Sequence, residues 1–217
     1  AARVIKQNGG EFLGTLPLLP IGYEGERPET SPYSPLTRLF WNEIYLDVTQ
    51  LPGTYKAEGD TWPDDDSELV DYSACYKRKK DILLAASAAF FDEYPEGDEA
   101  FQDYVNKNSH LREYADFRAR KHPDADYEAM VKFHLYSQYA CHLQLSRIRE
   151  EVEAGQAAAL YLDYTVGVHP DGFDAQRLSD LFLKGYQVGA PPDKTFIQGQ
   201  TWGFEPMHPR KLEESRF

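Results

Sequence analysis

The feature that most constrains the fold is a long helical pattern followed directly by a short apolar strand. From about Asp126 apolar side chains recur at helical spacing, and the pattern stops at Gly155, a residue type that commonly ends helices. The apolar run 158–162 follows at once and is closed by Asp163. A helix, a short turn and a strand in this order are typical of α/β proteins. We therefore expect an α/β fold.

The rest of the chain adds further predicted elements. Residues 12–19 are apolar and predict a buried parallel strand that ends near Pro17, and residues 44–48 predict a second strand. Residues 51–66 predict a solvated linker, and one short helix is expected at about 177–183. Helical spacing predicts longer helices at about 71–95, 98–107, 109–120 with Ser109 as N-cap, and 126–154.

Composition and charge exclude several classes of partner. The chain has 23 Lys and Arg against 36 Asp and Glu, a formal net charge of −13, whereas nucleic acids and anionic membranes are bound by basic surfaces. The longest apolar run, about 82–91, is too short to span a bilayer, and residues 1–6 carry no apolar signal segment. We expect a soluble, cytoplasmic protein with no nucleic-acid or membrane partner.

Cysteine and aromatic usage bear on possible ligands. Cys75 and Cys141 both fall in predicted helices and outside any Cys-x-x-Cys or His/Cys metal pattern. We expect buried, reduced thiols rather than a disulfide, with no metal ion and no organic cofactor. Aromatic residues make up 14% of the chain, which leaves two interpretations: core packing, or a cleft whose flat rings bind sugars.

Asp163 is the best single candidate for a functional residue. A strand that ends in a carboxylate and opens into a long loop is the arrangement at the C-terminal face of a (β/α) barrel. The alternative is an aspartate that only caps a turn. The run after the strand adds His169, Asp171 and Asp174. A nucleophilic serine is not indicated, because the chain has no Gly-x-Ser-x-Gly motif.

A series of short blocks carries a resemblance to a known family. In chain order they are Leu16-Pro17-Leu18-Leu19-Pro20, Ser31-Pro32-Tyr33-Ser34-Pro35, Phe40-Trp41-Asn42-Glu43, Tyr161-Leu162-Asp163, Gly167-Val168-His169-Pro170-Asp171-Gly172, Val188-Gly189-Ala190-Pro191-Pro192-Asp193, Gly199-Gln200-Thr201-Trp202-Gly203 and His208-Pro209. The ordered set resembles the N-terminal part of the catalytic barrel of glycoside hydrolase family 77, the 4-alpha-glucanotransferases (amylomaltases, or disproportionating enzymes). The resemblance covers nearly the whole chain.

The resemblance implies a fold and a division of the chain. We expect a partial TIM-type (β/α) barrel with its first three strands and a helical insertion. Residues 1–54 would hold the first two strands and the Ser-Pro-Tyr loop, 55–135 the insertion, and 136–217 the long helix, the third strand and an active-site loop.

The resemblance also implies a substrate and the residues that bind it. The substrate would be maltodextrin or another α-1,4-glucan, bound by Tyr33, Asp163, Asp193 and Trp202. Further candidates are Ser31, His169, Asp171, Asp174 and Gln200. The chain departs from the family pattern at Gln176 and Lys194, which bears on fine substrate contacts.

The resemblance further implies that the catalytic carboxylates lie outside this chain. The family's nucleophile lies in an Arg-x-Asp-His motif, which the sequence lacks, so we expect the nucleophile and the acid/base beyond Phe217. The parent protein would transfer α-1,4-glucan segments between maltodextrins with retention, whereas the chain alone would be inactive and would self-associate through an exposed barrel edge. Two alternatives remain open: a non-catalytic glucan-binding module, and a helical interaction protein.

Overall fold

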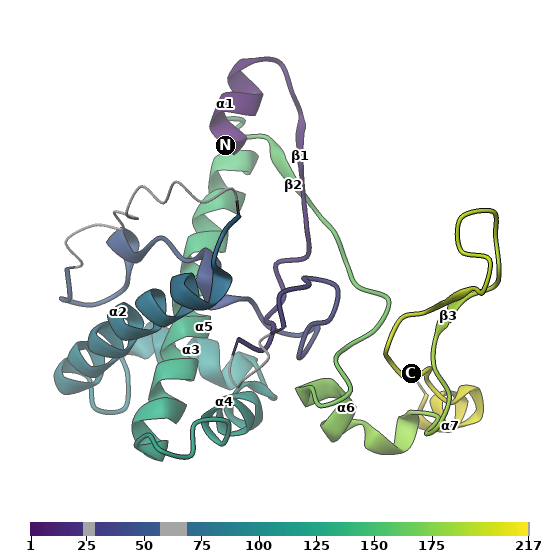
Figure 1. The fold of residues 1–217 in the computed structure, drawn as a ribbon. Coiled ribbons are helices and arrows are strands. Elements are labelled where there is room, and N and C mark those ends of the chain that lie inside the picture. Colours follow the sequence, from purple (N-terminus) through teal and green to yellow (C-terminus); the bar gives the residue numbers. More distant parts are fainter. Residues whose placement is uncertain (24–28, 57–68, 217) are drawn as a thin grey trace. The chain divides into compact units, whose positions relative to one another are not determined.

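The chain divides into two compact units, each built from segments that are distant in sequence. The computed structural model describes residues 1–23, 29–56 and 69–216 (Figure 1). Unit 1 consists of Ala1–Thr15, Tyr23–Pro28 and Trp41–Leu162. Unit 2 consists of Leu16–Gly22, Glu29–Phe40 and Asp163–Phe217.

Unit 1 is rich in helices, in agreement with the sequence. Its main helices are α2 (Tyr72–Glu93), α3 (Glu99–Lys107), α4 (Leu111–Ala119) and α5 (Tyr127–Glu153). The long helix α5 packs against the other three (Figure 1). The predicted bounds are confirmed to within two residues, except that His110 rather than Ser109 precedes α4 as its N-cap.

Local side-chain chemistry explains where these helices begin and end. Asp71, Asp98 and Asp126 each accept a hydrogen bond from the backbone N–H three residues further on, at 3.0, 2.7 and 2.9 Å. An aspartate in this position satisfies one of the free N–H groups of the first turn. Gly155, with φ of +71°, follows α5 in the left-handed conformation that ends a helix without steric cost.

Much of the aromatic content is in the core of unit 1. Phe90, 1% exposed, lies with its ring centroid 5.3 to 5.6 Å from those of Phe91, Phe101 and Tyr136. These rings come from α2, α3 and α5, so they join the neighbouring helices α2 and α3 to the later helix α5. For these residues core packing is the correct interpretation of the aromatic content.

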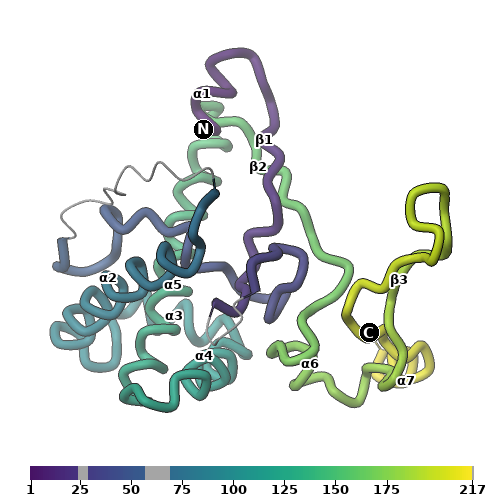
Figure 2. The backbone as a smooth tube through the Cα atoms, in the orientation of Figure 1, coloured from purple at the N-terminus to yellow at the C-terminus, as the bar shows by residue number. Residues whose placement is uncertain are grey.

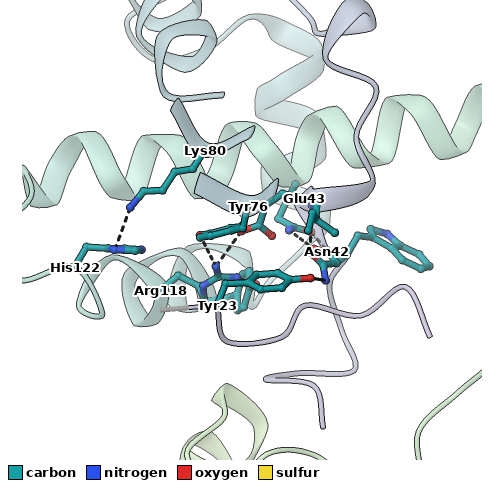
Figure 3. A network of polar contacts seen from close by, with 11 residues as sticks. Tyr23, Asn42, Glu43, Tyr76, Lys80, Arg118 and His122 are labelled. Carbon is teal, nitrogen blue, oxygen red and sulfur yellow. Dashed lines mark hydrogen bonds and ion pairs between the residues drawn. The ribbon is translucent and has the colours of Figure 1, made fainter. Parts of the chain in front are cut away.

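A buried ion pair lies beside this core (Figure 3). Arg118 of α4 and Glu43 are both almost fully buried, and Nη2 of Arg118 lies 2.9 Å from Oε1 of Glu43. The guanidinium also donates to the hydroxyls of Tyr114 at 2.8 Å and Tyr76 at 3.1 Å. Tyr23 stacks on Tyr76, with ring centroids 4.8 Å apart. One side chain thereby ties α4 to α2 and to the segment around Glu43.

A short parallel sheet lies at one end of unit 1 (Figures 1 and 2). Strand β1 (Phe12–Thr15) pairs with β2 (Ala159–Leu162), in the register from Phe12 opposite Ala159 to Thr15 opposite Leu162. The predicted parallel pairing of these two segments is confirmed. Helix α1 (Ala2–Gln7) joins them through the N–H of Ala158, which donates to the carbonyl of Ala2 at 3.1 Å.

Two strand predictions need correction. The first strand stops at Thr15, close to the predicted end near Pro17, which cannot donate to a neighbouring strand. Its predicted burial was wrong, however, since Phe12 is 66% exposed. The strand predicted at 44–48 is absent from this described segment.

Residues 43–50 form two 3-10 turns instead. These are η1 (Glu43–Tyr45) and η2 (Val48–Gln50). The side chain of Asn42 accepts from the N–H of Ile44 at 3.1 Å, and that of Asp47 accepts from the N–H of Thr49 at 3.0 Å. Such local hydrogen bonds compete with strand pairing, and here they prevail.

Unit 2 has little regular structure. It contains α6 (Phe173–Arg177), η3 (Ser179–Leu181), β3 (Gly189–Ala190), β4 (Gln200–Thr201) and α7 (Pro209–Ser215). Strands β3 and β4 form an antiparallel hairpin. The short helix expected at about 177–183 is present as the 3-10 helix η3, and α6 is an additional helix just before it.

The remaining predictions concern membranes and cysteines. In the residues described, no helix has both the length and the apolarity to cross a bilayer. Cys75 and Cys141 are free thiols in α2 and α5, as expected. Cys141 is buried, and this burial raises the pKa of its thiol, whereas Cys75 is only half-buried, contrary to expectation.

We predict that the buried ion pair is a major determinant of the stability of unit 1. Replacing Arg118 with Met should lower the free energy of unfolding by about 3–5 kcal/mol, because the Glu43 carboxylate stays buried without its cation. Urea denaturation followed by circular dichroism measures this loss. Arg120→Gln is the matched control, since that exposed pair with Asp116 should contribute about 1 kcal/mol or less. Equal losses in the two variants would contradict the prediction.

Candidate functional site

Unit 2 contains a hollow that brings together several of the candidate residues. Its volume is about 730 Å³, within the range of small-molecule sites. Among the described residues it is lined by Glu29, Ser31, Tyr33, Ser34, Val166, His169, Pro170, Asp171, Trp202, Gly203 and Phe204. The lining comes from three stretches of chain, at 29–34, 166–171 and 202–204, of which the first is more than a hundred residues from the other two.

Backbone hydrogen bonds hold the Ser-Pro-Tyr loop against the loop after Asp163. The N–H of His169 donates to the carbonyl of Pro35 at 2.8 Å, and the N–H of Leu36 donates to that of Pro20 at 2.7 Å. Gly172 allows the close approach, because a Cβ there would lie 2.6 Å from the carbonyl oxygen of Leu36. The position of the loop is therefore set by main-chain contacts.

Asp174 fastens the same two segments through its side chain. It is 5% exposed, and its carboxylate accepts from the hydroxyl of Thr37 at 2.6 Å and from the N–H of Arg38 at 2.9 Å. Its own N–H donates to the carbonyl of Leu36 at 3.3 Å. Both carboxylate oxygens are thus engaged inside the protein, which places this candidate away from the hollow.

Tyr33 and Asp163 are in direct contact. The hydroxyl of Tyr33 donates to Oδ2 of Asp163 at 2.8 Å, and this hydrogen bond raises the pKa of the phenol. Asp163 also accepts, through Oδ1, from the N–H of Tyr164 at 2.8 Å. The Tyr33 ring is 50% exposed and lines the hollow, so its face is accessible while its hydroxyl is held. The expected proximity of the two residues is confirmed.

His169, Asp171 and Ser31 form one rim of the hollow. Nδ1 of His169 accepts from the N–H of Asp171 at 3.1 Å, which fixes the orientation of the imidazole ring. Oγ of Ser31 accepts from the N–H of Tyr33 at 3.3 Å. The carboxylate of Asp171 remains exposed at the rim.

Trp202 faces the hollow from the hairpin of unit 2. Its backbone N–H donates to the carbonyl of Val188 at 2.9 Å, just beyond the β3–β4 pair. The indole is 46% exposed, and its ring centroid lies 6.3 Å from that of Phe204. Gly167 leaves room for the Phe204 ring, since a Cβ there would lie 2.2 Å from that ring.

Asp193 and Gln200 lie in the same hairpin but outside the described lining. Oδ1 of Asp193 accepts from the N–H groups of Thr195 at 2.7 Å and Phe196 at 2.6 Å, so its carboxylate shapes the hairpin tip. Oε1 of Gln200 accepts from Nε1 of Trp202 at 3.4 Å, a long hydrogen bond that orients the indole.

The comparisons with known proteins identify the family. The family model described as 4-alpha-glucanotransferase, glycoside hydrolase family 77, matches residues 1–128 and 118–217. The chain belongs to this family. A 4-alpha-glucanotransferase of Mycobacterium tuberculosis is 28% identical over 225 residues, which cover 87% of this chain and 31% of the relative. A 4-alpha-glucanotransferase of Chlamydia pneumoniae is 26% identical over 241 residues, which cover 89% of this chain and 44% of the relative.

Solved structures of amylomaltases share the fold. The amylomaltase of Corynebacterium glutamicum matches with a TM-score of 0.70 and 27% identity, over 98% of this chain and 33% of that one. The amylomaltase of Streptococcus agalactiae, solved in complex with acarbose, matches with a TM-score of 0.80 and 19% identity. The match covers 97% of this chain and 48% of that amylomaltase. The chain spans only about a third, 31%, of the length of the mycobacterial relative.

The sequence indicated the family, but it did not indicate all of the residues that line the hollow. Glu29 and Phe204 line it and were not among the candidates. Phe204 follows Trp202-Gly203 in one of the matching blocks, so an aromatic flanking a candidate aromatic was the available signal. Glu29 had no such signal. Its Oε1 accepts from the N–H groups of Thr30 at 2.8 Å and Ser31 at 2.7 Å, which only the folded loop reveals.

The chemistry of the hollow suits a neutral ligand with many hydroxyl groups. Carboxylates at Glu29 and Asp171 accept hydrogen bonds, and the rings of Tyr33 and Trp202 offer flat apolar faces. Within the described ranges, no group of three or more His, Cys, Asp or Glu side chains is arranged to hold a metal ion.

We predict that Asp174 stabilises the loop that carries Tyr33. Asp174→Asn should lower the free energy of unfolding by about 1–3 kcal/mol. The asparagine amide has one oxygen, so it cannot replace both carboxylate oxygens that accept from Thr37 and Arg38. Hydrogen exchange at the Arg38 amide should accelerate in the variant. Asp180→Asn, at an exposed position in the same unit, is the control and should leave that amide unchanged. Unchanged exchange at Arg38 in Asp174→Asn would refute this role.

Proposed function

We propose that this chain is the glucan-contacting, N-terminal part of a 4-alpha-glucanotransferase. The parent protein would transfer α-1,4-glucan segments between maltodextrins with retention of configuration. Membership of the family supports the activity, and the hollow of unit 2 supports the location of the substrate. The observation that carries the proposal is the contact of Tyr33 with Asp163. The Tyr33 hydroxyl donates to Asp163 at 2.8 Å, and the Tyr33 ring lines the hollow together with a second exposed ring, that of Trp202, whereas Asp163 itself is outside the described lining.

The proposed roles follow from the exposure of each side chain. The Tyr33 and Trp202 rings, each about half exposed, would stack on pyranose rings. Asp163, fixed by two hydrogen bonds, would accept from sugar hydroxyls through its remaining lone pairs. His169, Asp171 and Ser31 would contact the sugar from the rim.

The other candidates would support the site rather than touch the sugar. Asp174 is buried with both carboxylate oxygens engaged, and Asp193 holds the tip of the hairpin. Gln200 orients the Trp202 indole. We propose that these three residues position the loops on which the glucan-contacting side chains lie.

The arrangement of the whole chain is also a proposal. The parallel pair β1–β2 would belong to a (β/α) barrel that further chain completes, with residues 55–135 as a helical insertion between the flanking parts 1–54 and 136–217. The exposed Phe12 and Tyr161 on these strands favour self-association of the chain when it is produced alone. The chain would act in the cytoplasm.

Maltodextrin binding tests the site directly. Trp202→Ala should weaken the binding of maltoheptaose to this chain by about 0.5–1.5 kcal/mol, the contribution of one stacked ring. Asp163→Asn should cost about 1.5–3 kcal/mol, the contribution of a charged acceptor. Titration calorimetry measures both.

Matched controls separate binding from folding. Tyr186→Ala removes a ring that is 63% exposed in the same unit and lies outside the described lining, and Asp180→Asn removes an exposed carboxylate there. Both controls should keep the original affinity, and all four variants should keep the melting temperature. An affinity unchanged by both Trp202→Ala and Asp163→Asn, in folded protein, would overturn the assignment of this site.

We also predict that the 217-residue chain alone does not disproportionate maltotriose. Retaining transfer needs two carboxyl groups about 5–5.5 Å apart, one of them a nucleophile, and the chain lacks the Arg-x-Asp-His motif in which the family carries that nucleophile. Chromatography of the products, with an intact 4-alpha-glucanotransferase as positive control, tests this. Release of glucose together with longer maltodextrins by the purified chain would show that the catalytic pair lies elsewhere in it.

A further inference from the structure

A second hollow, in unit 1, has a chemistry opposite to that of the rest of the chain. It has a volume of about 550 Å³, and the described residues that line it include Lys77, Lys80, Lys121 and His122. Asp124 is the one carboxylate in that described lining. The lining thus has three lysines and one carboxylate, whereas the whole protein has a formal net charge of −13. This local reversal of charge is independent of the glucan-binding hollow in unit 2.

Two elements of unit 1 bring the basic groups together. Lys77 and Lys80 are three residues apart on α2, so they project from the same face of the helix. Lys121 and His122 lie in the turn between α4 and α5. Nζ of Lys80 lies 3.2 Å from Nδ1 of His122, which joins the two elements across the hollow (Figure 3).

The contact between Lys80 and His122 holds the Lys80 ammonium group in place and sets which nitrogen of His122 accepts. An ammonium group has only donors, so Nδ1 of His122 accepts and the proton of the neutral ring lies on Nε2. Lys121 is held by the face of the Phe117 ring, 4.8 Å from its centroid, and Lys77 is exposed. Partly held cations lose less side-chain entropy when a ligand binds.

The walls of the hollow indicate a ligand larger than an inorganic ion. Its volume falls in the range of sites for small organic molecules, and the lining includes the edges of two stacked rings, Tyr23 and Tyr76, that are otherwise buried. Phosphate monoesters carry a charge of about −1.5 to −2 at pH 7 and strong acceptor oxygens, which match several ammonium donors. A long polyanion such as RNA is disfavoured by the acidic surface elsewhere.

We propose that this basic hollow binds a small phosphate monoester of the hexose phosphate class. Lys77, Lys80 and Lys121 bind the phosphate oxygens, and the rest of the hollow holds the carbon skeleton. Asp124 weakens binding by repelling the phosphate. The site lies in the helical part of unit 1, so the bound ester would act as an effector rather than as a glucan substrate.

Nuclear magnetic resonance titration of this chain tests the proposal. Glucose 6-phosphate, added at constant ionic strength and pH, should shift the ring signals of His122, identified by their loss in His122→Gln. The expected dissociation constant is about 1 mM or lower. Glucose at the same concentrations should leave these signals unchanged, because the phosphate supplies the charge. Equal shifts with glucose, or none with the ester up to about 10 mM, would overturn the proposal.

Charge variants connect the binding to the named residues. The double variant Lys80→Gln, Lys121→Gln should weaken binding by about tenfold or more, as expected for lost hydrogen bonds to a charged group. Asp124→Asn should strengthen it. Lys107→Gln, which removes an exposed lysine of α3 outside this lining, should change it by less than about twofold.

Two further variants keep the test independent of folding. Lys77→Gln alters an exposed side chain and should weaken binding without lowering the melting temperature. Lys80→Arg keeps the charge and should restore most of the affinity that Lys80→Gln loses. If the folded double variant Lys80→Gln, Lys121→Gln binds the ester as tightly as Lys107→Gln does, these lysines do not form the site.

Discussion

The buried ion pair between Glu43 and Arg118 joins three segments of the helical unit. A buried guanidinium needs acceptors for its donors, and here a carboxylate and two tyrosine hydroxyls accept from Nη1 and Nη2. Glu43 lies in η1, one of the two capped 3-10 turns that residues 43–50 form, so the pair also joins this segment to α4.

The same principle recurs in unit 2 on a smaller scale. Asp174 is buried and fastens Thr37 and Arg38, so the loop carrying Tyr33 has a fixed base. Main-chain hydrogen bonds from His169 and Leu36 complete the frame. Side chains that would meet a sugar can then stay half exposed, because other residues hold the loops. In the proposed site, stability and ligand contact would thus be carried by different residues of the same sequence blocks, and burial distinguishes the two groups.

The two hollows differ in chemistry as well as in location. That of unit 2 combines exposed rings with carboxylates, which suits a neutral sugar chain. That of unit 1 gathers lysines in an acidic protein. The net charge of −13 describes the long-range field of the molecule, whereas the charges nearest to each hollow differ from that average.

The sequence by itself determined the helices, the family and most of the sugar-site candidates. Helical periodicity and capping aspartates such as Asp98 are local signals, and the ordered blocks around Tyr33, Asp163 and Trp202 indicate the family without any knowledge of packing. Only the tertiary structure decided that residues 44–48 are not a strand, that Asp174 is buried, and that Lys80 meets His122. Those outcomes depend on contacts between residues far apart in the chain, whose energies outweigh local preference and leave no periodic trace in the sequence.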